Sequence, residues 1–316
     1  MSNAPGIAFQ ILQSVFVVLA APLLVGWVNQ CRAWLQNRSA PSLLLPYYTL
    51  AKLFNKDAVF AHDASPIFRW TPYILFGCMW LAAGIVPVLA TGLPFAPAAD
   101  IIALVGVFAL ARMFSALAAM DVGTSFGGLG ARREMLIGFL AEPAMLMTLF
   151  TASLISHSTS LATIVETLGH REFVIYPSMA FAAVAFLMVL LAENARIPID
   201  NPSTHLELTM IHEAMILEYS ARHLALIEWA ASLKLTAYVA IGIAIFLPWG
   251  IAGAGDWIGL PIALAALVLK LLGAGAGLAL LETVSAKMRI FRAPEFLGTA
   301  FMLATLGMLI HFLLER

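Results

Sequence analysis

Charged side chains are scarce in this 316-residue chain: Asp, Glu, Lys and Arg make up 11% of it, whereas hydrophobic residues make up 62%. A water-soluble domain of this length does not need so much apolar surface, so the composition indicates a helical protein that crosses a membrane several times. The lipid bilayer is therefore one expected partner. The formal net charge of −1 provides no global field for anionic polymers, and we expect no nucleic-acid partner.

Cysteine is almost absent as well. Cys31 and Cys78 are the only two, they lie far apart in the sequence, and the chain has no CxxC pair and no Cys/His cluster at metal spacing. We therefore expect neither an iron–sulfur centre nor a structural zinc in this chain, nor any other cofactor of its own. Both cysteines are predicted to be ordinary apolar packing residues.

Motifs of common soluble enzymes are missing too. The stretch Gly127–Gly130 (GGLG) lacks a preceding strand and a Gly-Lys-Ser/Thr ending, so it predicts a flexible turn and not a phosphate-binding loop. His212-Glu213 is not followed by a second histidine at the spacing of the HExxH zinc motif. No GxSG nucleophile and no paired-aspartate signature is present, so the sequence does not predict a protease.

Long apolar runs dominate what is present. The first, Ile7 to Val28, has no Lys or Arg before it, so it predicts a retained membrane helix and not a signal peptide. Eight runs predict membrane spans, at about 7–30, 70–91, 100–120, 135–156, 173–193, 227–249, 258–281 and 296–314. The predicted fold class is all-α: a polytopic membrane protein with about eight transmembrane helices plus short interfacial helices, in a single integral membrane domain over residues 1–316. One interfacial helix is predicted near Leu43–Lys56, because its apolar residues can share one helix face.

Basic residues are distributed unevenly between the loops. Twelve of the 17 lysines and arginines lie in the four loops after spans one, three, five and seven, whereas the opposite side holds only Arg171 and Arg316. Lysine and arginine mark cytoplasmic loops, so these four loops are predicted to be cytoplasmic and both termini to lie outside the cytoplasm.

Four ionisable side chains lie within the predicted spans: Arg112, Glu142, Lys234 and Lys270. A charge in lipid is costly, so such groups face the protein interior or water and pair with one another. Glu142 and Arg112 lie at similar depth, and Glu142 is expected to pair with Arg112 or with Lys234. Such pairs either fix helix packing or form a proton relay, and the residue types alone leave both functions open.

Acids and histidines are concentrated between Glu193 and His223, directly after an uncharged run and around a break at Pro198. Besides these two, the ionisable acids and histidines of the stretch are Asp200, Glu207, Glu213, Glu218, His205 and His212. The acids either feed a relay or are solvated loop charges. The histidines are expected to contact a partner or to tune nearby acids, and no metal site is predicted.

Several motifs, in the right order, resemble one family. Leu191–Pro202 (LAENARIPIDNP), then Glu207-Leu208, then Glu218-Tyr219-Ser220, is similar to a membrane subunit shared by respiratory complex I and the energy-converting nickel–iron hydrogenases. In complex I this is the H-type subunit of the NADH dehydrogenase, which lies next to the quinone. The resemblance extends over essentially the whole chain.

The hydrogenase branch of the family is the more similar one. Gly130–Pro143 (GARREMLIGFLAEP) resembles a segment of formate hydrogenlyase membrane subunits, and Thr204–Met215 resembles a group of hydrogenase-4 component C or formate-hydrogenlyase-like subunits. Ser203, His205 and Ala221 differ from the family pattern where complex I lines its quinone chamber. These differences disfavour quinone binding in this chain.

The resemblance implies a division of labour between this chain and its partners. A cytoplasmic arm of hydrogenase-like large and small subunits and a ferredoxin-like subunit would carry iron–sulfur clusters and, where retained, a nickel–iron site. Antiporter-like membrane subunits would adjoin the chain in the inner (plasma) membrane of a prokaryote. A redox change in the arm would shift the loop 194–226 and move protons through buried acids and lysines.

The family match also implies roles for particular residues. By this match Glu142, Glu193, Asp200, Glu207 and Glu218 would be relay or junction acids, and Arg133 and Arg196 would order the loops. With the charged residues of the spans added, the predicted proton relay consists of Glu142, Glu193, Asp200, Glu207, Glu218, Lys234, Lys270 and Arg112. The predicted partner-interface residues are Arg38, Arg132, Arg133, Arg196, His205 and His212. In this interpretation the chain is a non-catalytic subunit of an oxidoreductase complex.

Three other functions stay open at this point. The chain is alternatively the quinone-adjacent H-type subunit of a complex I-like NADH dehydrogenase, a passive anchor for the soluble arm, or a stand-alone transporter. The differences from the family pattern in segment 203–221 are the feature that distinguishes the first of these from the hydrogenase-type function. A change of Glu142 to Gln that leaves assembly intact separates the second from a proton-translocating subunit.

Overall fold

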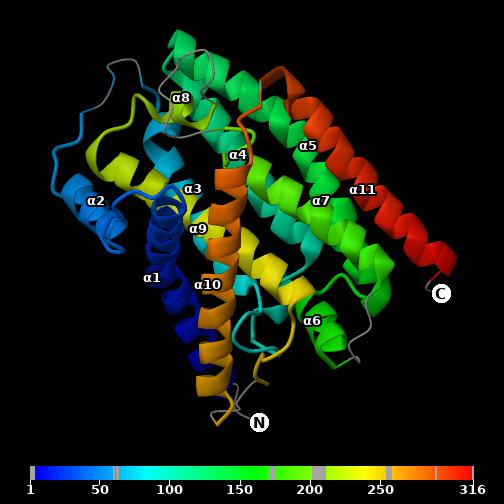
Figure 1. The fold of residues 1–316 in the computed structure, drawn as a ribbon. Coiled ribbons are helices and arrows are strands. Elements are labelled where there is room, and N and C mark those ends of the chain that lie inside the picture. The colour runs from blue at the N-terminus through cyan, green and yellow to red at the C-terminus, as the bar shows by residue number, and fades with distance from the viewer. Residues whose placement is uncertain are drawn as a thin grey trace.

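The computed structural model describes residues 4–59, 61, 64–170, 176–200, 211–253, 258–288 and 290–314, and these form a bundle of helices (Figure 1). Within these ranges no extended strand is present, and two isolated bridges, Ala90 with Ala252 and Asp100 with Ser160, join connecting segments. The predicted all-α class is therefore confirmed for the described part of the chain.

Eight long helices make up the bundle. They are α1 (Ala4–Leu35), α3 (Pro66–Ile85), α4 (Ile101–Asp121), α5 (Ser125–Ser156), α7 (Pro177–Glu193), α9 (Ala221–Phe246), α10 (Leu260–Val284) and α11 (Ala293–Leu314). Short helices and turns connect them: α2 (Leu45–Phe54), η1 (Ala96–Ala98), α6 (Leu161–His170), α8 (His212–Ile216) and η2 (Ile290–Arg292).

Each of the eight predicted spans corresponds to one long helix, so the polytopic architecture is confirmed. In the described residues six helices, α1, α4, α5, α9, α10 and α11, are long and apolar enough to cross a bilayer, and α7 is apolar but has only 17 residues. The number of spans is therefore approximate. The short helix predicted near Leu43–Lys56 is present as α2, and its position at the membrane surface stays a prediction.

Two local predictions were wrong. The span predicted to reach residue 91 ends at Ile85, because Val86 precedes Pro87 and takes an extended conformation that an α-helix cannot continue. The predicted flexible turn at Gly127–Gly130 is the beginning of α5, whose N-cap is Thr124, where the Oγ1 atom accepts a hydrogen bond from the Gly127 amide at 3.3 Å.

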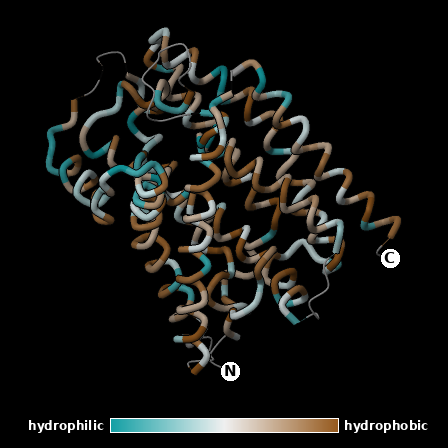
Figure 2. The backbone as a smooth tube through the Cα atoms, in the orientation of Figure 1, coloured by the Kyte–Doolittle hydropathy of each residue, from teal (hydrophilic) through white to brown (hydrophobic). Residues whose placement is uncertain are grey.

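Helix α9 is central, and α10 and α11 are peripheral. Helix α9 contacts α1, α2, α3, α7 and α10, whereas α11 packs mainly on α5 and α7 and α10 mainly on α1. Hydrophobic residues run along the helices, and hydrophilic residues gather toward the end that carries α8 (Figure 2). We call this end the polar end; it comprises the described residues 36–59, 64–65, 121–125, 194–200, 211–220 and 285–288, and it is the end predicted to face the cytoplasm.

Hydrogen bonds across the polar end join segments that are distant in sequence. The Ser65 amide donates to Asp121 Oδ2 at 2.8 Å, and the Met288 amide donates to the Pro198 carbonyl at 2.9 Å. The start of α3 is thereby attached to the end of α4, and the segment after α10 to the turn after α7.

The glycines at the start of α5 allow a close approach of backbone. A Cβ atom added at Gly130 would lie 2.9 Å from the Ile211 carbonyl oxygen and 3.0 Å from Ala214 Cβ, whereas one at Gly128 would meet nothing within 4 Å. Gly130 therefore lets α8 pack directly on α5. Gly128, two residues away, faces open space.

We predict that Gly130→Ala destabilises the protein by about 1–3 kcal/mol, because α8 must move away from α5. Gly128→Ala is the matched control, and it is expected to be neutral or slightly stabilising because alanine favours the helical state. Thermal unfolding of both variants in lipid nanodiscs checks this. Equal melting temperatures for the two variants would contradict the packing seen here.

Candidate functional site

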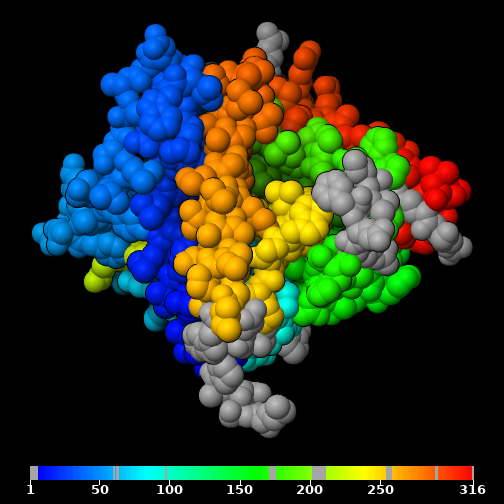
Figure 3. Space-filling model, turned by 60° about the horizontal axis from the view of Figure 1, so that its bottom comes forward, coloured from blue at the N-terminus to red at the C-terminus, as the bar shows by residue number. Residues whose placement is uncertain are grey.

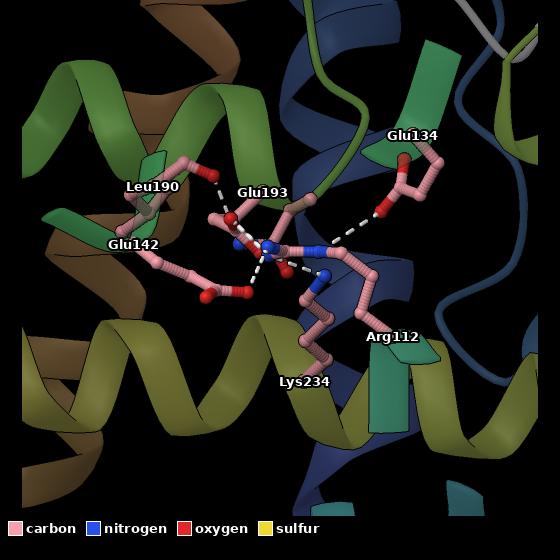
Figure 4. Close-up of polar contacts among 7 residues, drawn as sticks. Arg112, Glu134, Glu142, Leu190, Glu193 and Lys234 are labelled. Atoms are coloured by element: carbon pink, nitrogen blue, oxygen red, sulfur yellow. Dashed lines mark hydrogen bonds and ion pairs between the residues drawn. The ribbon is translucent and has the colours of Figure 1, made fainter. Parts of the chain in front are cut away.

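Arg112 on α4 lies at the centre of a buried group of ion pairs (Figure 4). Its Nη1 donates to Glu142 Oε1 on α5, its Nη2 donates to Glu193 Oε1 at the end of α7, and its Nε lies 3.6 Å from Glu134 Oε1. The Arg112 side chain is only 7% exposed. Three carboxylates thus surround the one guanidinium group, and its positive charge attracts all three of them.

Lys234 on α9 adds a second cation. Its Nζ lies 3.1 Å from Glu193 Oε2, so the two oxygens of Glu193 face two different cations. The Glu193 side chain is 2% exposed, and the two cations compensate the cost of removing its charge from water. We call Arg112, Glu134, Glu142, Glu193 and Lys234 the buried charge cluster.

The helix period explains why α5 supplies two members of the cluster. Glu134, Gly138 and Glu142 are spaced by four residues, so they lie on one face of the helix. Gly138 makes room for the cation between them, because an added Cβ would lie 2.7 Å from Arg112 Cδ. A carboxylate, a gap and a second carboxylate therefore face α4.

The buried charge cluster has unequal numbers of acids and bases. It contains three carboxylates, Glu134, Glu142 and Glu193, against two cations, Arg112 and Lys234. With every group ionised, one negative charge is in excess. An excess charge is costly in surroundings of low dielectric constant, and one bound proton removes it, so the cluster is chemically suited to bind and release a proton.

Glu142 is the member that reaches the surface of the chain. Its side chain is 33% exposed, and Phe139, one turn before it on α5, is 77% exposed. A carboxylate on the outside of a membrane helix needs water or another polar group, which lipid tails do not provide. This position therefore connects the cluster to whatever covers this face of α5.

A cavity of about 380 Å³ adjoins the cluster on its other side. Its lining includes Arg112, Glu193 and Lys234 from the cluster, and His212 and Glu213 from α8 at the polar end. The cavity is lined by both charged and apolar side chains, and it is large enough to hold several water molecules. It links the predicted cytoplasmic side to the buried ion pairs.

Asp200 lines the same cavity. It is buried, and its Oδ2 accepts a hydrogen bond from the Ile211 amide at 3.3 Å. Glu218, by contrast, is exposed on the polar end. Glu207 and His205, also predicted from the sequence, lie outside the described residues.

The predicted interface residues have different environments. Arg38 and Arg132 are exposed, and Arg133 is partly buried. Arg196 lies in the turn after α7, where its Nη1 donates to Glu282 Oε1 at 3.0 Å. His212 begins α8 and lines the cavity. Their proposed contact with a partner stays a prediction.

Lys270 lies apart from the other predicted relay residues. Its Nζ donates to the Leu247 carbonyl at 2.6 Å and to the Trp249 carbonyl, just beyond the end of α9. A cation at this place is favourable because the last carbonyls of a helix carry partial negative charge. Neither of these carbonyls belongs to the buried charge cluster, and a role in proton transfer stays a prediction for this residue.

The Glu218-Tyr219-Ser220 motif attaches α9 to earlier segments. Tyr219 stacks on Phe68 with ring centroids 4.0 Å apart, and its hydroxyl donates to the Phe68 carbonyl at 2.9 Å. Burial raises the pKa of Tyr219 above its usual value, so its hydroxyl remains a donor. Ser220 Oγ accepts from the Val59 amide at 2.9 Å and donates to the Val59 carbonyl at 2.8 Å.

Sequence reasoning missed three residues of the site. These are Glu134, Gly138 and Tyr238, and the last is fully buried and packs against Phe108 and Phe186. The four-residue spacing of Glu134, Gly138 and Glu142 was an available signal. Tyr238 is one of many apolar-looking positions of α9 and has no such signal.

The structure is therefore that of a polytopic membrane protein whose helices enclose paired charges beside a cavity. The model of the family described as NADH dehydrogenase matches residues 7–313, and the chain belongs to this family. The family predicted from the sequence motifs is thereby confirmed.

Two relatives in Escherichia coli (strain K12) indicate which branch of the family this chain is similar to. The chain is 30% identical to formate hydrogenlyase subunit 4 over 301 residues, which cover 95% of this chain and 97% of the relative. It is 33% identical to hydrogenase-4 component C over 245 residues, which cover 77% of this chain and 76% of that relative. Both relatives are subunits of multi-subunit complexes by their names, so the resemblance to the hydrogenase branch is confirmed.

A solved structure has the same fold. A chain in the membrane-bound sulfane sulfur reductase, an archaeal respiratory membrane complex, superposes with a TM-score of 0.81 at 18% identity, covering 96% of this chain and 98% of that one. The bundle described here is therefore a fold found in respiratory membrane complexes.

We predict that Glu193→Gln and Lys234→Met each destabilise the protein by about 3 kcal/mol, because each removes one counter-charge from a buried ion pair. The double variant is expected to lose about 1–3 kcal/mol less than the sum of the single losses, since the two groups contact each other. Unfolding in lipid nanodiscs measures the three values.

Lys52→Met, at an exposed position on α2, is the control for loss of a lysine charge. It is expected to leave the free energy of unfolding unchanged. Strictly additive losses for Glu193 and Lys234 would show that the pair does not interact in the membrane.

Proposed function

We propose that this chain is the membrane subunit of an energy-converting, formate hydrogenlyase-like hydrogenase complex. It anchors a cytoplasmic redox arm at its polar end and couples electron transfer in that arm to proton translocation. The protons move through the buried charge cluster. The observation that carries the proposal is the single excess carboxylate in a cluster that adjoins a cavity with charged lining residues and that includes the part-exposed Glu142.

The proposed path has an entrance, a store and an exit. Protons enter from the cytoplasm through the cavity, past His212, Glu213 and Asp200. One proton is held by the carboxylates around Arg112. Glu142 passes it on at the face of α5, because it is the member of the cluster that is accessible from outside the chain.

The partners follow from the same geometry and from the relatives. A membrane subunit with polar side chains, of the antiporter-like type, covers Glu142, since lipid alone would leave a carboxylate in contact with hydrocarbon. The polar end, with exposed Arg38, and the adjoining start of α5, with exposed Arg132, receive hydrogenase-like large and small subunits and a ferredoxin-like subunit. Iron–sulfur clusters, and a nickel–iron site if one is retained, belong to those subunits.

Coupling requires that a redox change alters the cluster. Glu193 ends α7 and is followed directly by the turn 194–200, which lines the cavity at the polar end. A displacement of this turn by the docked arm changes the position of Glu193 relative to Arg112 and Lys234. The affinity of the cluster for its proton changes with these distances.

We predict that Glu142→Gln in the assembled complex abolishes most proton translocation while electron transfer continues, because glutamine keeps the size of the side chain and cannot carry the proton. The measurement uses membrane vesicles: acidification is followed with a pH-sensitive dye, and the redox turnover of the complex is followed in the same preparation. We expect the ratio of protons to electrons to fall by about tenfold.

Glu166→Gln, which alters an exposed carboxylate on α6, is the matched control and should leave the ratio unchanged. Glu142→Asp keeps the acid and is expected to restore part of the coupling. If Glu142→Gln leaves translocation intact in a fully assembled complex, the chain acts as a passive anchor and the proposal fails.

The size of the cavity favours a second candidate function, in which the chain is the H-type subunit of a complex I-like dehydrogenase and holds a quinone. At about 380 Å³ the cavity is in the range of small-molecule sites, and its wall includes apolar Val25, Leu75, Met79 and Phe108 beside the charged groups. Inhibition of electron transfer by a quinone analogue that competes with added quinone would support this function. Insensitivity to such an analogue supports the hydrogenase-type function.

A further inference from the structure

Glu282, near the end of α10, joins two arginines from different parts of the chain. Its Oε1 accepts from Arg196 Nη1 at 3.0 Å, and its Oε2 faces Arg32 Nη1, in the last turn of α1, at 3.4 Å. The Glu282 side chain is 1% exposed, so it is a buried carboxylate with one arginine on each oxygen. No member of the buried charge cluster takes part in these two ion pairs.

The turn that follows α7 connects this second group of ion pairs to the cluster. Glu193 and Arg196 are three residues apart, and between them the chain reverses through Ala195, whose φ of 49° is left-handed. The turn is closed by hydrogen bonds from the Arg196 amide to Leu191 O and from the Ile199 amide to Arg196 O, both at 2.9 Å. A displacement of Arg196 therefore moves Glu193.

Helix α10 is otherwise attached to the bundle mainly through α1 (Figure 3). It lies on the outside of the molecule next to α1, and its contacts with α9 are few. At its polar end the attachment is made by Glu282 and by the hydrogen bond from the Met288 amide to the Pro198 carbonyl at 2.9 Å. Both contacts reach the turn after α7, so this turn and the end of α10 hold each other in place.

We propose that Glu282 is the positioning residue for Glu193: by holding Arg196 it keeps the turn after α7 in the conformation that places Glu193 between Arg112 and Lys234. Its significance for proton movement rests on the function proposed above. Without Glu282, Arg32 and Arg196 repel each other and the turn is released, although no residue of the buried charge cluster has been altered.

Hydrogen–deuterium exchange of the assembled complex in lipid nanodiscs tests this. In Glu282→Gln we expect the amides of Arg196, Ile199 and Met288 to exchange about tenfold faster, because their hydrogen bonds lie in the released turn. Glu282→Asp keeps the charge and should show a smaller increase. Glu295→Gln, at an exposed acid at the start of α11, is the matched control and should leave exchange at these amides unchanged.

A double-mutant cycle keeps the test decisive if the single variant is unstable. Glu282→Gln combined with Arg196→Gln removes the unpaired cation of the turn together with its partner. We expect the amides of the turn to exchange more slowly in the combined variant than the product of the two single-variant rate increases predicts. Independent effects, or unchanged exchange in Glu282→Gln, would overturn the positioning role.

The same variants distinguish this inference from the proposed function. If Glu282→Gln speeds exchange in the turn and Glu142→Gln leaves proton translocation intact, then Glu282 positions the turn but the relay proposal fails. If Glu142→Gln uncouples the complex and Glu282→Gln changes neither exchange nor the ratio of protons to electrons, then only the positioning role fails. Loss of coupling in both variants, with faster exchange in Glu282→Gln, supports both.

Discussion

The guanidinium group of Arg112, held between carboxylates from α5 and α7, is the interaction on which the rest of the structure depends. A bilayer provides no water to stabilise a charge, so a chain that keeps an arginine at this depth must supply counter-charges from neighbouring helices. Supplying them fixes the relation of α4, α5, α7 and, through Lys234, α9. Each of these four helices also contributes residues to the lining of the cavity, together with α1, α3 and α8.

The structure separates its charges into two groups with different chemical character. The cluster around Arg112 has more acids than bases and is suited to hold a proton. The group around Glu282 has more bases than acids, since one carboxylate faces Arg32 and Arg196. The turn after α7 belongs to both, which gives the polar end of the molecule a short covalent connection to the interior of the bundle.

Some of the site was predictable from residue types alone. The expected pairing of Glu142 with Arg112 is present, because opposite charges at one depth in a membrane have few other partners. Lys270 satisfies the same rule in another way, by donating to carbonyls beyond the end of α9. Depth along a helix limits the possible partners of a charge, but it does not say which neighbouring helix provides them.

The sequence by itself determined the class of the molecule: apolar runs of membrane length specify helices, the basic loops predict an orientation, and the motifs around Glu193 identify the family. These features are local, so neighbouring residues suffice to produce them. Only the tertiary structure decided that Gly138 makes room for Arg112, that GGLG is helical, and that Glu282 joins two arginines. Those facts depend on distances between helices, which arise when side chains far apart in the chain pack against one another.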